Sequence, residues 1–396
     1  MTEVYLGIDT SCYTTSLFFM DRQGEKVAEA RRILKVKPGG CGLQQSEMLY
    51  QHTRNLPELM EEAVQGQSFY LLGIGVSAKP RPREDSYMPA FLAGLGFARS
   101  LAALHHIPLW QISHQENHLE AAAWSAKGPD ADRFLFLHAS GGTTDLLLAE
   151  KSSSIAAEKN VSEAAATEKK IKKNAVAEKK SDVAAIATEI NKSVSNYTLQ
   201  EIGCSLDLHA GQFVDRVGVA LGLGFPAGPA LEQLASQHTE IVEIPVSVHK
   251  TEVSFSGPCT WVLRKIEQCL TAKTEKDFTA DNCTEAEQLS STEILQSTAA
   301  LQTKTVTPQN NFAANIAAGV QWGLAETLVR MIRNAGAEYN CREVLLAGGV
   351  ASNQWIRNQI IGKLAKRQIR VWLPEAKYSG DNAAGCAAYA RRQNER

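Results

Sequence analysis

The sequence predicts an α/β protein with two lobes, built on a duplicated unit and separated by a central cleft. The chain has 396 residues, whereas one domain has about 100 to 200, and this favours two packed units. Residues 4–27 and 133–153 each show an apolar strand, a small polar turn with paired threonines and a second apolar strand. The pattern recurs after about 130 residues, which indicates a duplication.

Duplicated hairpins of this kind are typical of the actin-like and sugar-kinase-like (ASKHA) proteins, whose two lobes share a ribonuclease-H-like fold and bind ATP between them. We therefore expect a first lobe over residues 1–130, joined by a C-terminal helix at 381–396, and a second lobe over residues 131–380. Two polar stretches, at about 151–196 and about 271–310, are poor in apolar residues. They are predicted to be solvated insertions in the second lobe.

The remaining elements follow the same α/β pattern. Residues 68–78 predict a strand and a turn, and residues 88–108 contain an Ala/Leu/Gly-rich helix that would pack under a sheet. A further strand then leads to His114. Residues 343–364 predict a buried strand, a glycine turn and a helix with Asn353 near its start. Such a turn suits a nucleotide, because a helix N-terminus offers unpaired N–H groups, although many turns of this kind bind nothing.

The amino-acid composition of the chain restricts which partners it can bind and in which cellular compartment it is expected. The net charge is -2, so the chain has no overall basic field, and any RNA contact must be local. The eight cysteines include no C-x-x-C pair, and no stretch approaches the roughly 18 apolar residues of a membrane helix. We expect a reduced, cytoplasmic protein with no membrane contact.

His114 and His118, in "HQENH", are the first candidates for chemistry. Residues four apart share a helix face, so both imidazoles can reach one ion. A metal site needs a third ligand, and Asp381 in "YSGDNAAGCAAYA" is the candidate. Two alternatives stay open: the histidines are structural, or Asp381 is a helix N-cap. Glu116 lies two places after His114, not directly after it as in zinc proteases, and it is assigned no catalytic role.

Seven motifs then resemble those of the TsaD family, the tRNA threonylcarbamoyladenosine synthases, in the same order along nearly the whole chain. They are "GIDTSC", "HQENH", "SGG-T", "GQFVDRVGVALGLGFPAGP", "SFSG", "AGGVASN" and "GDNAA". The resemblance implies one divalent metal per subunit, iron or zinc, held by His114, His118 and Asp381. It also implies ATP or an adenylate as a ligand beside this metal.

The same resemblance implies the residues around the nucleotide. Asp215 would bind the ribose hydroxyls, Gly228 would permit close approach, and Asn353 would lie beside the purine or the ribose. The small-residue turn of the family falls on His138, Ala139, Ser140, Gly141, Gly142 and Thr143.

The implied reaction is acyl transfer from threonylcarbamoyl-adenylate to an adenosine of tRNA, with AMP as the leaving group. Polarisation and charge stabilisation by the metal, together with positioning by the glycine turns, would accelerate it. A nucleophilic Ser or Cys is not required. We therefore expect Cys12 to be a buried core residue rather than a reactive thiol. A kinase of this fold would need acidic residues for Mg²⁺ at the first turn, and the chain has none there.

The sequence departs from the family on the acceptor side. Tyr13 and Thr14 replace an acidic pair, and Thr143 replaces a histidine. Residues 78–84, "AKPRPRE", replace a glycine-rich turn and add a basic loop of Lys79, Arg81 and Arg83 through which tRNA would bind. These changes keep two alternatives open: a carbamoyltransferase with a small-molecule or protein acceptor, or a non-catalytic partner subunit. A TsaB-like subunit or a second copy of the chain is the expected protein partner.

Overall fold

The computed structural model describes residues 1–36, 42–151, 196–278 and 308–395. The first predicted insertion lies outside these residues except at its two ends. Most of the second predicted insertion, residues 279–307, also lies outside them, between helix α8 (Ser256–Phe278) and helix α10 (Pro308–Glu338). Among the described residues, no helix combines the length and the apolar character that crossing a membrane requires.

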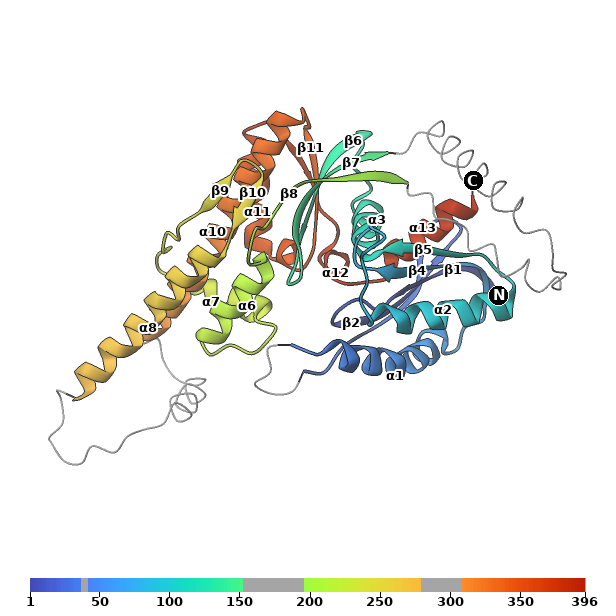
Figure 1. Cartoon of the computed structure of the whole chain (residues 1–396), viewed down its shortest axis with the longest axis horizontal. Coiled ribbons are helices and arrows are strands. Elements are labelled where there is room, and N and C mark those ends of the chain that lie inside the picture. Colours follow the sequence, from blue (N-terminus) through green and yellow to red (C-terminus); the bar gives the residue numbers. More distant parts are fainter. Residues whose placement is uncertain (37–41, 152–195, 279–307, 396) are drawn as a thin grey trace.

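A five-stranded mixed sheet forms the centre of the first lobe (Figure 1). Its order is β3-β2-β1-β4-β5, with antiparallel pairing from β1 through β3 and parallel pairing from β1 to β5. The five strands are β1 (Thr2–Asp9), β2 (Thr14–Asp21), β3 (Lys26–Ile33), β4 (Phe69–Lys79) and β5 (Leu109–Ser113).

The second lobe repeats this sheet strand for strand. Its order is β12-β11-β6-β7-β8, with β6–β7 and β7–β8 antiparallel and β6–β11 and β11–β12 parallel. Hairpin β6–β7 therefore corresponds to hairpin β1–β2, as the repeated pattern predicted, and the duplicated actin-like fold is confirmed by the topology. The strands are β6 (Arg133–Ala139), β7 (Thr144–Lys151), β8 (Tyr197–Cys204), β11 (Glu343–Ala347) and β12 (Arg370–Trp372).

Both faces of the first sheet are covered by helices, which explains its continuous apolar strands. Helices α1 (Gln45–Val64) and α2 (Phe91–His105) bury one face, and α13 (Ala384–Asn394) buries the other. Gly7 and Gly75 lie opposite each other on β1 and β4 beneath α13. A Cβ on either glycine would overlap the α13 segment backbone, so the two glycines allow the close approach of this helix.

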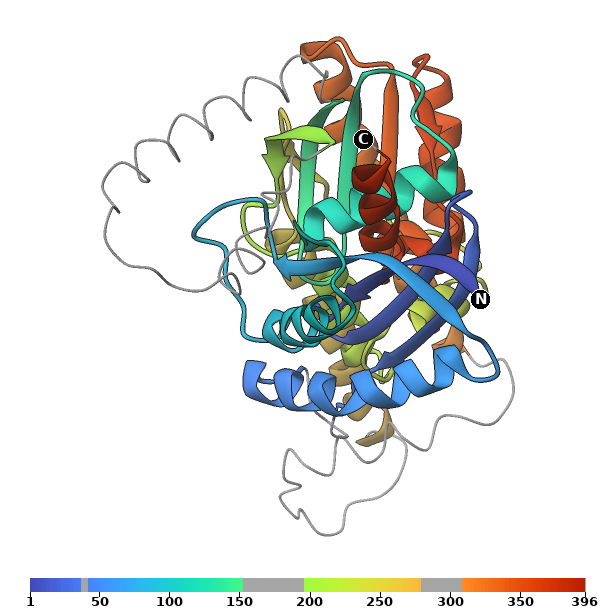
Figure 2. The same ribbon diagram turned by 90° about the vertical axis from the view of Figure 1, so that its right-hand side faces the viewer.

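Helix α3 (His114–Ala126) lies beside α13 and packs on the second sheet against β6 and β11 (Figure 2). The opposite face of that sheet is buried mainly by α10. The other elements of this lobe are α6 (Ala210–Ala220), α7 (Gly228–Ala235), β9 (Ser247–His249), β10 (Glu252–Ser254), η2 (Val350–Ser352), α11 (Gln354–Ala365) and α12 (Ala376–Ser379). The middle layer of α3 and α13 thus lies between the two sheets. The residue bounds given above for the two lobes stay predictions.

Candidate metal and nucleotide site

A capping box fixes where helix α3 begins. The Ser113 hydroxyl accepts a hydrogen bond from the Glu116 backbone N–H at 3.2 Å, and the Glu116 carboxylate accepts one from the Ser113 backbone N–H at 2.8 Å. This arrangement satisfies two of the N–H groups that a helix start leaves free. Glu116 therefore has a structural role, and His114 becomes the first residue of the helix.

His114, His118 and Asp381 converge, as predicted. The Nε2 atoms of the two histidines are 3.0 Å apart, and Asp381 Oδ1 lies 3.6 Å from Nε2 of His114 and 3.4 Å from Nε2 of His118. Ligands held about 2.1 Å from a tetrahedral ion are roughly 3.3 Å apart, so the three atoms have the spacing that one ion requires. Among the described residues these three side chains form a group that could hold a metal ion.

Two asparagines place Asp381 over the histidines. The Asn382 side chain donates to the carbonyls of Tyr378 and Gly380, and Asn117 on α3 donates to the Asn382 carbonyl at 2.7 Å. The alternative in which Asp381 caps a helix is wrong, because α13 begins at Ala384 and its first N–H bonds to the side chain of Asn382 instead. The carboxylate of Asp381 is therefore free for a ligand role.

Asp9, at the end of β1, lies behind His114. Its Oδ2 is 3.5 Å from Nδ1 of His114, which is the arrangement that orients a metal-binding imidazole. Burial lowers the pKa of His114, but the charges of Asp9 and Asp381 outweigh it and leave the pKa raised. Burial and the neighbouring His114 lower the pKa of His118. His118 is thus held neutral, in the form that binds a metal.

His138, at the end of β6, contacts the same pair. Its ring centroid lies 4.2 Å from that of His118 and 6.2 Å from that of His114. The side chain is buried, and neither ring nitrogen has a hydrogen-bond partner in the structure. Burial and the two nearby imidazoles hold its pKa well below the ordinary value. The structure thus brings a predicted nucleotide residue against the metal candidates.

The rest of the predicted nucleotide turn joins β6 to β7. Ser140 N–H donates to the Thr143 carbonyl at 2.7 Å, and Gly211 N–H, at the start of α6, donates to the Ser140 carbonyl at 3.0 Å. A Cβ at Gly141 or Gly142 would meet no other atom, so the turn exposes bare backbone beside a helix N-terminus. Such a turn is suited to an anion.

The other predicted nucleotide residues lie on the helices next to this turn. Asp215 on α6 accepts a hydrogen bond from Ala227 N–H at 2.8 Å, and burial raises its pKa. Gly228 begins α7, with open space around its Cα. Asn353 caps α11 through Ile356 N–H. The side chains of Asp215 and Asn353 therefore already have a local structural bond, and the ribose and purine contacts stay predictions.

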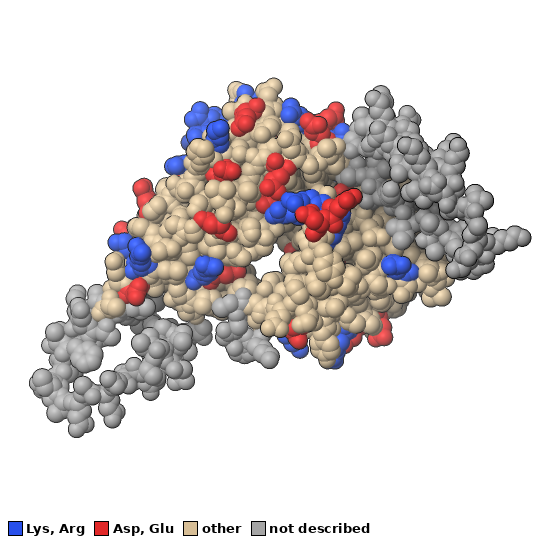
Figure 3. Space-filling view, viewed as in Figure 1, with Lys and Arg blue, Asp and Glu red and all other residues tan. Residues whose placement is uncertain are grey.

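The predicted basic loop is largely paired within the protein. Arg81 forms ion pairs with Asp145 on β7 at 2.9 Å and with Glu201 on β8 at 3.6 Å. Arg83 is paired with Asp85, and the Lys79 ammonium donates to the Arg83 carbonyl. Figure 3 shows basic and acidic side chains gathered above the opening between the lobes. Arg81 thus ties the first lobe to the second.

Tyr13 and Cys12 follow β1 at the same opening. The Tyr13 ring makes an edge contact with Phe225 of the second lobe, with centroids 6.0 Å apart. Cys12 is only partly buried, so its expected place in the core was wrong. Burial, with the charges of Asp381 and Asp9, raises the pKa of the Cys12 thiol to about 12, so this thiol is not a nucleophile at neutral pH.

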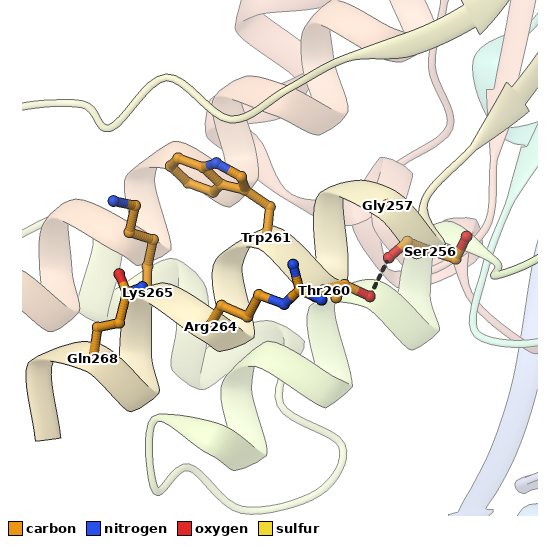
Figure 4. Close-up of a pocket in the computed structure, with 7 residues that line it drawn as sticks. All are labelled: Ser256, Gly257, Thr260, Trp261, Arg264, Lys265 and Gln268. Carbon is orange, nitrogen blue, oxygen red and sulfur yellow. Dashed lines mark hydrogen bonds between the residues drawn. The ribbon is translucent and has the colours of Figure 1, made fainter. Parts of the chain in front are cut away.

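A surface pocket of about 620 Å³ runs along α8, away from these residues. Figure 4 shows Trp261, Arg264 and Lys265 on its wall, and the Lys265 ammonium lies 5.6 Å from the centre of the Trp261 ring. None of the predicted site residues lines it. The converging polar groups, rather than this pocket, mark the candidate site.

Three residues at the site were missed from the sequence: Asp9, Gln115 and Asp145. Each is buried, and each lies at or next to the end of an apolar strand. A charged side chain at the end of a buried strand is the signal that could have found Asp9 and Asp145. Gln115 carries no such signal, because it follows His114 in a polar run.

The fold and the site define the class: a two-lobed actin-like protein with a candidate metal centre between its lobes. A sequence profile described as "TsaD: tRNA N6-adenosine threonylcarbamoyltransferase" matches residues 25–199 and 183–388. The chain belongs to this family.

The relatives are distant but full-length. A tRNA N6-adenosine threonylcarbamoyltransferase of Crocosphaera subtropica is 27% identical, covering 98% of this chain and 92% of that protein. One from Methanopyrus kandleri is 24% identical, covering 96% and 85%. Solved structures with some similarity include component A of the (R)-2-hydroxyglutaryl-CoA dehydratase of Acidaminococcus fermentans. That match has a TM-score of 0.47 and 14% identity and covers 100% of both chains.

Proposed function

We propose that this protein is a metal-dependent transferase that moves a threonylcarbamoyl group from threonylcarbamoyl-adenylate to the exocyclic amine of an adenosine in tRNA. The observation that carries the proposal is the convergence of His114, His118 and Asp381 at ion-binding spacing. Membership of the family supports the choice of reaction. A partner subunit without catalysis would not need this arrangement of side chains.

The three side chains would hold one divalent ion, iron or zinc, through two nitrogens and one oxygen. Asp381 is the most exposed of the three, with 23% of its side chain accessible, so open positions would face the cleft on its side. A bound ion would supply Lewis-acid polarisation and would stabilise negative charge that develops on the donor. Asp9 would keep the His114 ring in its ligating orientation.

The exposed turn of residues 140–143 would bind the phosphate of the adenylate through the backbone N–H groups that the turn does not already use, since those of Ser140 and Gly142 are bonded within it. Asp215 and Asn353 would contact the nucleoside. In the transfer, the amine nitrogen forms a bond to the carbamoyl carbon, and the bond from that carbon to the phosphate oxygen breaks. The electron pair leaves with AMP, and one amine proton is released to the leaving phosphate or to water. The protein chiefly supplies orientation here.

The basic loop and the protein partners are further parts of the proposal. Arg83 is exposed, and among the described residues its guanidinium is paired with Asp85 alone, so an RNA phosphate would readily take the place of that carboxylate. A related TsaB-like subunit or a second copy of this chain would complete the assembly.

A second candidate is a transferase that uses a similar adenylate but a small-molecule or protein acceptor. Two contacts favour it, because both span the opening through which a tRNA base would enter. Tyr13 touches Phe225, and Arg81 is bound to Asp145 and Glu201. An acceptor smaller than an RNA loop would pass these contacts more easily.

The test is to incubate metal-loaded protein with threonylcarbamoyl-adenylate labelled in the threonine. The acceptors are a tRNA with adenosine beside its anticodon, the same tRNA lacking that adenosine, and a mixture of small primary amines. Label on the first tRNA alone is the expected result. Label on small amines alone would favour the second candidate, and AMP release from none of the mixtures would reject transferase activity.

A further inference from the structure

The carboxylate of Asp145 is buried. One of its oxygens is hydrogen-bonded, and the other has no partner among the described residues. Its Oδ2 accepts from the Gln115 amide at 3.1 Å and from the Arg81 guanidinium at 2.9 Å. Its Oδ1 is inaccessible to solvent and has no partner in the structure. An arginine commonly bridges both oxygens of a carboxylate, but here both donors converge on the same one. A bare, buried carboxylate oxygen needs an explanation, since leaving it unpaired is costly.

A second unpaired group lies next to Asp145. His138 and Asp145 are directly opposed on β6 and β7, so their side chains project from the same face of the sheet with Cβ atoms about 5 Å apart. Both ring nitrogens of His138 lack partners, and the ring touches His118. A neutral imidazole has one acceptor nitrogen. Two hydrogen-bond acceptors thus stand side by side, next to the metal candidates.

We propose that His138 and Asp145 form the subsite for the acceptor amine, in which Asp145 Oδ1 and one nitrogen of His138 each accept an N–H of a primary amine. An amine has two N–H donors, and the subsite has two vacant acceptors. The remaining lone pair of the nitrogen is then left for the carbamoyl carbon. This inference rests on the proposed transferase function and names the two residues that would hold its acceptor amine.

The neighbours of Asp145 are consistent with this role. Gln115 comes directly after His114 on α3, so its bond to Oδ2 ties the position of the carboxylate to that of the metal ligands. Arg81 holds the same oxygen from the outside, with about a third of its side chain exposed. Both donors hold the carboxylate in place while leaving Oδ1 to the substrate. The acceptor would enter past the loop that carries Arg81.

The experiment compares RNA stem-loops that differ only in the amine: adenosine, N6-methyladenosine and N6,N6-dimethyladenosine, with two, one and no N–H groups. Equilibrium binding to the metal-loaded protein and label transfer are both measured. For the wild type, affinity should fall at each step along this series. In Asp145→Ala, the total discrimination between the first and last RNA should shrink by at least about 10-fold, the loss expected for one hydrogen bond to a charged group.

Two further variants separate this role from a structural one. Asp145→Asn keeps a carbonyl oxygen and should retain part of the discrimination. Glu201→Gln removes the other partner of Arg81 without touching Oδ1, and should behave as the wild type. Metal content should be unchanged in all three variants, and acceptor-free release of AMP should be unchanged in Glu201→Gln.

The inference is overturned if Asp145→Ala and the wild type show the same ratio of affinities for the adenosine and the N6,N6-dimethyladenosine RNA. It is also overturned if the wild type binds the three RNAs equally well. Selective binding without any transfer would reject the proposed function while leaving the subsite in place.

Discussion

Hairpins β1–β2 and β6–β7 occupy equivalent places in the two lobes, yet their polar groups are satisfied very differently. In the first, Asp9 pairs with Ser16 across the strands, and in the second His138 pairs with Asp145 at the same register. Asp9 accepts hydrogen bonds from Ser11 and Ser77, and Ser16 accepts one from Ala383 N–H. The equivalent groups in the second hairpin include unpaired nitrogens and an unpaired oxygen.

This contrast indicates that the two equivalent hairpins have different roles, one structural and one in binding. Backbone topology is the same in both hairpins, so it cannot distinguish them. A hairpin whose buried polar atoms are all bonded supports its surroundings, whereas one with several bare atoms at the same place requires a ligand or water. The first hairpin therefore contacts His114 and the C-terminal segment, whereas the second is the one that we propose binds the substrate.

The largest expected effect comes from removing His114 and His118. These two side chains lie between Asp9 of the first hairpin and His138 of the second. In His114→Ala with His118→Ala, two of three ligands are lost, so affinity for zinc or iron should fall by roughly 100-fold or more. The wild type should carry about one ion per chain if the site is as described. Metal analysis after dialysis, with His249→Ala on the surface as the control, measures this. Equal metal content in the wild type and the double variant would place the ion elsewhere.

A smaller effect is expected from one added methyl group in each lobe. Gly7→Ala puts a Cβ against the Ala383 carbonyl and should lower the free energy of unfolding by about 1 to 3 kcal/mol. Gly141→Ala points into open space and should leave stability within about 0.5 kcal/mol. It should nevertheless weaken adenylate binding, because the turn loses close access to its backbone.

Denaturant unfolding and adenylate binding of both variants test this pair. The comparison of the two lobes fails if Gly141→Ala is the more destabilising of the two, or if Gly7→Ala alone weakens adenylate binding.

A further effect, of similar size, concerns the pH dependence of stability. Burial raises the pKa of Asp145 from its ordinary value of 3.8 to about 6, partly offset by Arg81. Between about pH 4 and 6 the folded state then binds more protons than the unfolded state, so stability falls as pH rises through this window. Asp145→Asn removes this contribution, which is on the order of 3 kcal/mol for a shift of this size.

Thermal unfolding from pH 4 to 7 provides the measurement. The stability of Asp145→Asn relative to the wild type should increase with pH across this range. Asp132→Asn, with a carboxylate almost fully exposed at the surface, should run parallel to the wild type. Parallel curves for Asp145→Asn as well would show that Asp145 titrates normally and that Oδ1 is solvated.

Periodicity and the repeated hairpin were enough to predict the duplicated fold, because strand patterns and their order depend on local sequence. The metal group was proposed through helical spacing for His114 and His118, whereas Asp381 was chosen as a carboxylate beside the Gly380 turn, and the family motif then supported it. The cap by Asn382 and the Arg81 ion pairs depend on tertiary contacts. Asp145 could have been noticed as a charge at the end of a buried strand, but its unpaired oxygen is recognised only from the placement of its neighbours.

The contact between α3 and α13 has a consequence for how the protein matures. The two histidines are synthesised long before Asp381, and all five strands of the second sheet come from the intervening chain, whereas the first sheet is complete before His114. A nascent chain on the ribosome can therefore form the first hairpin and α3 early, yet it holds only two ligands. The candidate cation centre is completed when the segment around Asn382 docks on Asn117 and Ser16, so capture of an ion there would report a late step of assembly.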